Sequence, residues 1–115
     1  MTALRVLLVE DEMLIAMDVE DILVELGYQV VGPAMRLSRA LKIAREEAID
    51  LAVLDVNLAG EQSFPVADVL RERGIPFVFV TGYGAAGLTA DYADTTTLQK
   101  PVDLRQFKDA LARLR

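Results

Sequence analysis

The 115-residue sequence predicts a doubly wound α/β domain, in which helices cover both faces of a parallel five-stranded sheet. Three observations lead to this prediction. Short apolar runs occur five times along the chain, apolar residues at helical spacing follow most of them, and the connecting segments are short. Because parallel neighbouring strands need a crossover connection, usually a helix, this alternation predicts helices on both sides of a single sheet.

The first strand and helix have the most regular pattern. Residues 4–9 form a short apolar run with β-branched side chains, which is typical of a strand buried on both faces. Apolar residues between Ile15 and Leu26 then recur at helical spacing, and Gly27 suits a C-terminal cap. A second strand is expected over residues 28–31.

The middle of the chain continues the alternation. Gly32-Pro33 is expected to end the second strand, and a second helix is expected from about Ser38. A third strand is predicted over residues 49–54, followed by a loop over residues 57–62. Pro65 suits the first position of the next helix.

The last part of the chain is less uniform. Gly74 suits the cap of the third helix, and residues 76–80 form the most apolar strand. Residues 82–94 contain several glycines and little periodicity, so any helix there should be short. Residues 95–99 suit an edge strand, and Asp103 should cap a final helix.

Composition excludes several kinds of chemistry. The chain has no cysteine and no histidine, which removes disulfides, Cys or His metal sites and the Ser-His and Cys-His nucleophile systems. A net charge of −6 repels phosphate backbones and argues against nucleic-acid binding. No apolar run reaches the roughly 18 residues of a membrane helix, and the first residues lack a signal peptide. We therefore expect one cytoplasmic domain over residues 1–115, without a membrane or nucleic-acid partner.

Polar side chains gather where the predicted strands end. They are three carboxylates, one hydroxyl and one ammonium, from Glu10, Asp11, Asp55, Thr81 and Lys100. Each alone has a structural explanation, such as favourable charge at a helix start or a turn residue. The carboxyl ends of parallel strands meet at one edge, however, and that edge is where ligands bind in such sheets. Together the five residues predict a site.

The chemistry of this set favours a divalent cation and a phosphoryl group. Two carboxylates 4 Å apart repel by about 4 kcal/mol at an effective dielectric constant near 20. Oxygen ligands without His or Cys suit Mg²⁺, which would relieve this repulsion. Mg²⁺, Lys100 and the Thr81 hydroxyl could then hold the oxygens of a phosphoryl group. A carboxylate such as Asp55 could itself be the nucleophile and form an acyl phosphate.

These residues resemble a known family over essentially the whole chain. Val9-Glu10-Asp11-Glu12, Asp55, Thr81 and Lys100-Pro101 resemble the receiver domain of bacterial two-component response regulators. Asp55-Val56-Asn57-Leu58 and the segment from Pro76 to Gly84 resemble the FAT GUY receivers, which are largely alphaproteobacterial and often stand alone. The resemblance implies a flavodoxin-like (βα)5 fold with a short or irregular fourth helix.

The resemblance also implies a role for each site residue. Asp55 would accept a phosphoryl group from a sensor histidine kinase, the HWE type being one candidate, or from a phosphotransferase. The metal ligands for Mg²⁺ would be Asp11 directly, Glu10 through water, Asp55 and the backbone carbonyl of Asn57. Lys100 would contact the phosphoryl group, and Thr81 would move towards it and carry the signal. The Lys100-Pro101 bond would be cis. The domain would switch protein–protein binding, and its only catalysis would be on Asp55 itself.

Two positions depart from the family pattern. Thr97 stands where most receivers have a switch aromatic, and Ala59 stands where they have a proline. We therefore consider Tyr83, or a rearrangement of residues 82–94, as the replacement switch.

Other functions stay open at this point. A receiver fold that binds partners without phosphorylation is the main alternative, and the chain could also be the receiver of a larger regulator with an output domain. A dinucleotide site at the GxGxxG match of residues 82–87 is disfavoured, because no strand-ending acid follows for a ribose. A dehalogenase-like phosphatase is disfavoured because Asn57 stands where it needs a second acid.

Overall fold

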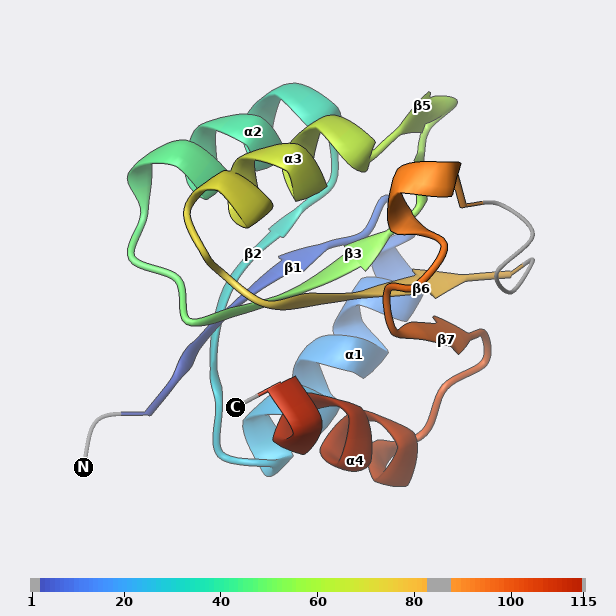
Figure 1. The fold of residues 1–115 in the computed structure, drawn as a ribbon. Helices are drawn as coiled ribbons and strands as arrows, with labels where there is room; N and C mark the ends of the chain where they lie inside the picture. Colours follow the sequence, from blue (N-terminus) through green and yellow to red (C-terminus); the bar gives the residue numbers. More distant parts are fainter. Residues whose placement is uncertain (1–2, 83–87, 115) are drawn as a thin grey trace.

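The computed structural model describes residues 3–82 and 88–114 and confirms the predicted fold class. Five parallel strands form one sheet in the order β2-β1-β3-β6-β7 (Figure 1). The strands are β1 (Arg5–Val9), β2 (Gln29–Ala34), β3 (Leu51–Asp55), β6 (Phe77–Thr81) and β7 (Thr97–Gln99). The chain thus winds from a central strand towards each edge, as expected for a doubly wound sheet.

Helices cover both faces of the sheet. Helices α1 (Met13–Glu25) and α4 (Leu104–Leu114) lie on one face, whereas α2 (Leu37–Glu46) and α3 (Phe64–Glu72) lie on the other (Figure 1). Between β6 and β7, the part of the chain that the structure describes contains only a three-residue 3-10 helix, η2 (Ala90–Tyr92). The expectation of a short fourth helix is therefore confirmed for these residues. No helix among the described residues is long and apolar enough to cross a membrane.

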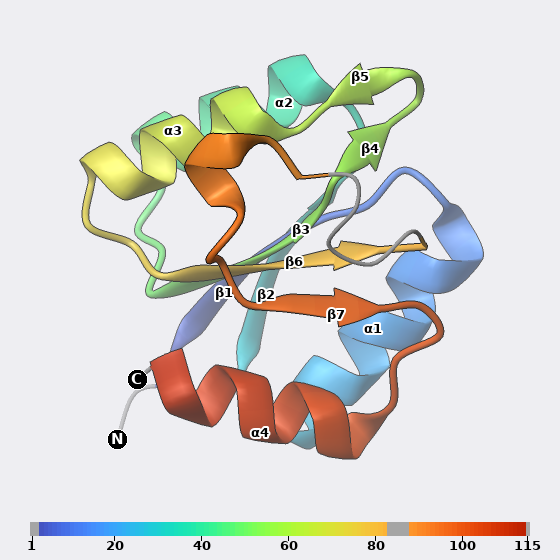
Figure 2. The same cartoon turned by 45° about the vertical axis from the view of Figure 1, so that its right-hand side comes forward.

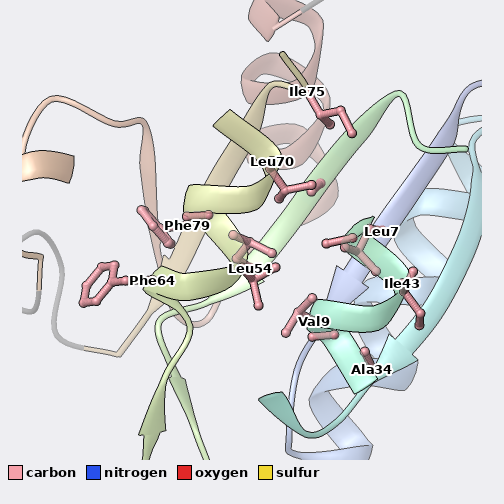
Figure 3. Close-up of a cluster of buried hydrophobic side chains, with 14 of the residues drawn as sticks. Leu7, Val9, Ala34, Ile43, Leu54, Phe64, Leu70, Ile75 and Phe79 are labelled. Atoms are coloured by element: carbon pink, nitrogen blue, oxygen red, sulfur yellow. The ribbon is translucent and has the colours of Figure 1, made fainter. Parts of the chain in front are cut away.

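Two hydrophobic cores sandwich the sheet, and the central strand β3 serves both. Ala52 and Leu54 belong to the core under α2 and α3, part of which Figure 3 shows. Leu51 and Val53 belong to the core under α1 and α4. All five residues of β3 are buried. This alternation is the pattern of a parallel strand that is covered on both faces.

An aromatic group holds η2 against the first of these cores. Tyr92 is only 2% exposed, stacks on Phe64 and meets Phe79 edge to face, with ring centroids 5.6 and 5.5 Å apart. Its hydroxyl donates a hydrogen bond to Asp68 of α3, and the guanidinium of Arg71 lies 4.1 Å from its ring centroid. The segment before β7 is thus fixed to α3 and β6 through Tyr92.

The prediction that Gly32-Pro33 ends the second strand is wrong. Strand β2 continues through this pair to Ala34, whose carbonyl accepts a hydrogen bond of 3.0 Å from the Glu10 N–H. Three features permit this: β2 is an edge strand, Gly32 has a φ of 109°, and the register with β1 shifts between Leu7 and Val9. Proline is accepted at such edges and irregularities because no ladder bond needs its missing N–H. The Gly32-Pro33 and Lys100-Pro101 bonds are both cis.

The loop predicted over residues 57–62 contains regular structure. Strands β4 (Asn57–Leu58) and β5 (Glu61–Gln62) pair as a small antiparallel hairpin (Figure 2). The side chain of Leu58 is 1% exposed and anchors the hairpin in the core under α2 and α3. The hairpin therefore has a defined position next to the carboxyl ends of the strands.

The helix starts agree with the predictions within one residue. Helix α2 begins at Leu37 and α3 at Phe64. Before α4, the Asp103 carboxylate accepts a hydrogen bond of 2.9 Å from the Gln106 N–H, and the Gln106 side chain accepts one of 3.1 Å from the Asp103 N–H. This reciprocal arrangement is a capping box, and it confirms Asp103 as the cap.

Candidate functional site

The sheet brings the five predicted strand-end residues to one edge. Asp55 and Thr81 are the last residues of β3 and β6, and Lys100 follows β7 directly. Glu10 and Asp11 follow β1 in the same way. The register is fixed by backbone bonds, since the Lys100 N–H donates to the Thr81 carbonyl over 2.9 Å. The parallel topology alone is therefore sufficient to assemble this set.

A cavity of about 480 Å³ opens at this edge. It is lined by the predicted residues Asp11, Asp55, Asn57, Thr81 and Lys100, together with Glu12, Val56, Gly60, Gln62 and Gly82. Glu10 lies below the lining and is 2% exposed. The cavity is polar and large enough for a small anion and its counter-ion.

Lys100 joins two buried carboxylates. Its Nζ lies 3.1 Å from Oε2 of Glu10 and 3.3 Å from Oδ2 of Asp55. All three side chains are largely buried, the most exposed being that of Lys100 at 17%. One ammonium thus neutralises only one of two carboxylate charges, so the buried group keeps a negative charge when both carboxylates are ionised.

Burial and the neighbouring charges together shift the pKa values of Asp55 and Lys100. Burial, and after it the neighbouring Glu10 carboxylate, raise the pKa of Asp55 to about 7 against the opposing effect of Lys100. Burial lowers the pKa of Lys100, but the Asp55 and Glu10 carboxylates outweigh it and leave the net shift upward. A buried carboxylate whose pKa lies near neutral pH is typical of functional sites.

The donor set fits a hard divalent cation. One carboxylate oxygen each from Glu10, Asp11 and Asp55 lie within 4.8 Å of one another. Three carboxylates against one ammonium leave an excess of negative charge that a cation would balance. Oxygen ligands of this kind are those that Mg²⁺ prefers. The Asn57 N–H donates to Oδ1 of Asp55 over 3.4 Å. Asn57 thus lies in the wall of the cavity, which is where its backbone carbonyl would have to be to bind the cation as predicted.

Of the two predicted switch residues, Thr81 and Tyr83, only Thr81 lies in the described part of the chain. Thr81 is 3% exposed and lines the cavity. Tyr83 lies outside the described residues. Thr97 is half-buried, and its hydroxyl donates to the Thr95 carbonyl over 3.0 Å, so its side chain bonds to the segment just before β7.

Sequence reasoning missed the contribution of the hairpin. Gly60 and Gln62 line the cavity, and the Ala59 N–H donates to Oδ2 of Asp11 over 2.8 Å. Gly60 was a turn signal, but a two-residue hairpin turn favours Asn, Asp or Gly at its first position. Alanine at that position gave no reason to expect strands on either side.

The fold and site together define a doubly wound α/β domain that carries an acidic pocket at the carboxyl edge of its sheet. The family model described as the response regulator receiver domain matches residues 6–112, and the chain belongs to this family. Receiver domains of response regulators are signalling modules rather than enzymes with a separate substrate.

Individual relatives are consistent with a FAT GUY-type variant. The solution structure of SdrG from Sphingomonas melonis Fr1 superposes with a TM-score of 0.87 at 42% identity, covering 99% of this chain and 98% of that one. The BeF3-activated conformation of SdrG has a TM-score of 0.82 at 43% identity over the same shares. The phyllosphere-induced regulator PhyR of Methylorubrum extorquens is 38% identical over 92 residues, which are 77% of this chain but only 34% of PhyR. The chain thus spans about a third of that relative.

Proposed function

We propose that this receiver accepts a phosphoryl group on Asp55 from a sensor histidine kinase or a phosphotransferase, and that the modification switches its binding to another protein. The observation that carries the proposal is the placement of Asp55. Its carboxylate lies in the cavity wall, 3.3 Å from the Lys100 ammonium and beside two further carboxylates. The arrangement supplies a nucleophile, positive charge and a cation site together.

The transfer requires little else from the protein. An oxygen of Asp55 forms a bond to phosphorus while the phosphorus–nitrogen bond of the phosphohistidine breaks, and the departing imidazole takes a proton from solvent. Glu10, Asp11, Asp55 and the Asn57 carbonyl would hold Mg²⁺, which supplies charge neutralisation for the phosphoryl oxygens. Lys100 would pair with the new anion, and the Thr81 hydroxyl would donate a hydrogen bond to it. The Tyr83 ring or the segment after it would carry the change onward.

An exposed apolar group next to the cavity supports docking of a kinase helix. Met13, Leu14 and Met17, on the first turns of α1, are 57%, 78% and 53% exposed. Apolar side chains this exposed are typical of surfaces that another protein covers. They follow Asp11 and Glu12 directly, so a partner seated on them could present a phosphohistidine to Asp55.

Intact mass spectrometry tests the acceptor. Wild type, Asp55→Asn and the control Asp109→Asn, whose side chain is exposed on α4, are incubated with Mg²⁺ and a small phosphodonor. We expect one phosphoryl adduct on wild type and the control, none on Asp55→Asn, and none after chelation of the metal. Equal adducts on wild type and Asp55→Asn contradict the proposal. So does the absence of an adduct with both a small donor and the cognate kinase, which favours the phosphorylation-independent binding module.

The docking group has its own test with a histidine kinase. Leu14→Glu should slow phosphotransfer from the kinase about tenfold or more but leave phosphorylation by the small donor unchanged. Val24→Glu is the matched control, because Val24 is 59% exposed at the other end of the same helix. Equal rates from the kinase for both variants exclude this surface.

A further inference from the structure

The turn of the β4–β5 hairpin has a backbone conformation that its sequence does not favour. Ala59 has a φ of 50° and Gly60 a φ of 88°. Both positive values are those of a two-residue hairpin turn, in which the first position usually carries Asn, Asp or Gly. An alanine pays a steric cost in the left-handed region, and residues held in this way tend to lie at functional sites. A compensating contact is therefore expected at Ala59.

That contact is a hydrogen bond to the acidic cluster. The Ala59 N–H donates to Oδ2 of Asp11 over 2.8 Å, and it joins the loop after β1 to the loop after β3 across 48 positions of sequence. Asp11 is one of the three carboxylates whose oxygens lie within 4.8 Å of one another. A carboxylate can accept about four hydrogen bonds or metal contacts in all, so this bond fixes its rotation without exhausting its oxygens.

The fold sets the position of this N–H group. Leu58, the residue before the turn, is buried in the core, and Leu58 pairs with Glu61 across the hairpin. The Ser63 N–H donates to the Val56 carbonyl over 2.8 Å and closes the base of the hairpin. The donor is thus held by core packing and by backbone bonds, so its direction does not depend on a long side chain.

We propose that the Ala59 N–H group positions Asp11 as a ligand before the cation arrives. The inference rests on the proposed function, since it assigns a role in the cation site described there. An N–H that is held by the hairpin keeps the Asp11 carboxylate turned towards Glu10 and Asp55, against the repulsion of those two groups. Proline at this position would have no N–H and could not adopt a φ of 50°. The hairpin turn and the alanine are therefore parts of one positioning device.

The sharpest test removes one hydrogen-bond donor and leaves every side chain in place. A full-length protein with lactic acid in place of Ala59 has an ester where the amide was, so the donor is lost while the methyl group stays. The matched control has glycolic acid in place of Gly60, whose N–H makes no hydrogen bond with the described part of the chain. Urea unfolding in the presence of chelator establishes that both proteins are folded.

The readout is binding of Mg²⁺ alone, followed by calorimetry and by the backbone amide NMR signals of residues 10–12 and 55–57. Outer partners of metal ligands typically change affinity 10–100-fold, so we expect the Ala59 ester to bind Mg²⁺ about tenfold more weakly than wild type. The Gly60 ester should bind within twofold of wild type.

The outcomes separate the two proposals. If wild type binds no Mg²⁺ at these residues, the cation site of the proposed function fails. If wild type binds and the Ala59 ester binds equally well, the site stands and the positioning role of Ala59 is overturned. Equal weakening of both esters also overturns it, because the loss then belongs to the hairpin in general rather than to the bond with Asp11.

Discussion

The Lys100 ammonium lies 3.3 Å from Oδ2 of Asp55, and it shares its charge with the buried carboxylate of Glu10. This shared pairing makes the acidic edge of the sheet costly to assemble, because a second buried carboxylate charge lacks a partner when no cation is bound. The first two predictions follow from this relationship.

Replacement of Asp55 by asparagine should stabilise the metal-free protein at pH 8. Burial raises the pKa of Asp55 from 3.8 to about 7, so its protonated form is favoured by the folded state. The stability contributed by this raised pKa is fully present below pH 3.8 and is lost as the pH rises through 7. The loss amounts to a few kcal/mol, roughly 1.4 kcal/mol for each pKa unit.

Urea unfolding in the presence of chelator, at intervals from pH 4 to pH 8, measures this effect. Wild type and Asp55→Asn should have similar unfolding free energies at pH 4, and the variant should become increasingly more stable towards pH 8. A difference that stays constant across this range would show that Asp55 does not titrate between these values.

Removal of the shared ammonium should destabilise the fold. Lys100→Met leaves Glu10 and Asp55 buried without their cation, and breaking a buried ion pair in this way costs about 3 kcal/mol. Lys108→Met is the matched control, because Lys108 is exposed on α4 and should change stability by less than about 0.5 kcal/mol. Thermal and urea unfolding at pH 8 compare the two. Equal stability of the two variants contradicts a structural role for the ammonium.

Tyr92 should contribute to stability through both its ring and its hydroxyl. Tyr92→Phe keeps the ring packing but removes the bond to Asp68, and the loss should be about 1 kcal/mol. Tyr92→Ala also empties a buried position between Phe64 and Phe79, which should cost about 4 kcal/mol. Unfolding at pH 7 orders the three proteins. A Phe variant as unstable as the Ala variant would mean that the hydroxyl dominates.

The same hydroxyl should make stability sensitive to alkaline pH. Burial and the hydrogen bond to Asp68 raise the pKa of Tyr92 from 10.0 to about 12. Stability from this group is fully present below pH 10.0 and is lost as the pH rises through 12. The advantage of wild type over Tyr92→Phe should therefore shrink between pH 9 and pH 12. Ultraviolet titration of the phenols in both proteins assigns the late transition to Tyr92.

Gly32 should be far less replaceable than another glycine of similar exposure and conformation. A Cβ at Gly32 would lie 2.8 Å from the Leu8 carbonyl oxygen and 2.7 Å from the Ala34 nitrogen, at a φ of 109°. Gly32→Ala should therefore cost about 3 kcal/mol. Gly27→Ala, at a φ of 94° with open space around it, should cost only about 1 kcal/mol. Urea unfolding of both variants measures the contrast, and equal losses exclude the contact with Leu8.

The strand-end residues were predictable because their placement depends only on the direction of the strands. Asp55 follows an apolar run and Lys100 follows another, so neither position is sensitive to an error of one or two residues in a helix boundary. Parallel topology then brings both to the same edge. This is why the predicted residues lie together at one edge of the sheet, although the sequence analysis ended the second strand too early.

The remaining features depend on contacts between distant segments, which local patterns do not encode. Strand β2 continues past Pro33 because the Ala34 carbonyl accepts a hydrogen bond from the N–H of Glu10, which follows β1. The hairpin forms although Ala59 disfavours its turn, since Asp11 lies where it can accept the N–H. Tyr92 lies in a stretch with weak periodicity, and only the placement of Phe64 and Phe79 makes it a core residue.

Strand β3 carries Asp55 at its end and packs with alternate residues into both cores. A sliding or tilting movement of this strand would open gaps in both cores at once, so packing on both faces holds the backbone of Asp55 in place. When the Asp55 carboxylate becomes larger, the residues around it must therefore move, because strand β3 does not. The side chains of Thr81 and Lys100, which line the cavity next to Asp55, are therefore the ones that an enlarged carboxylate would displace.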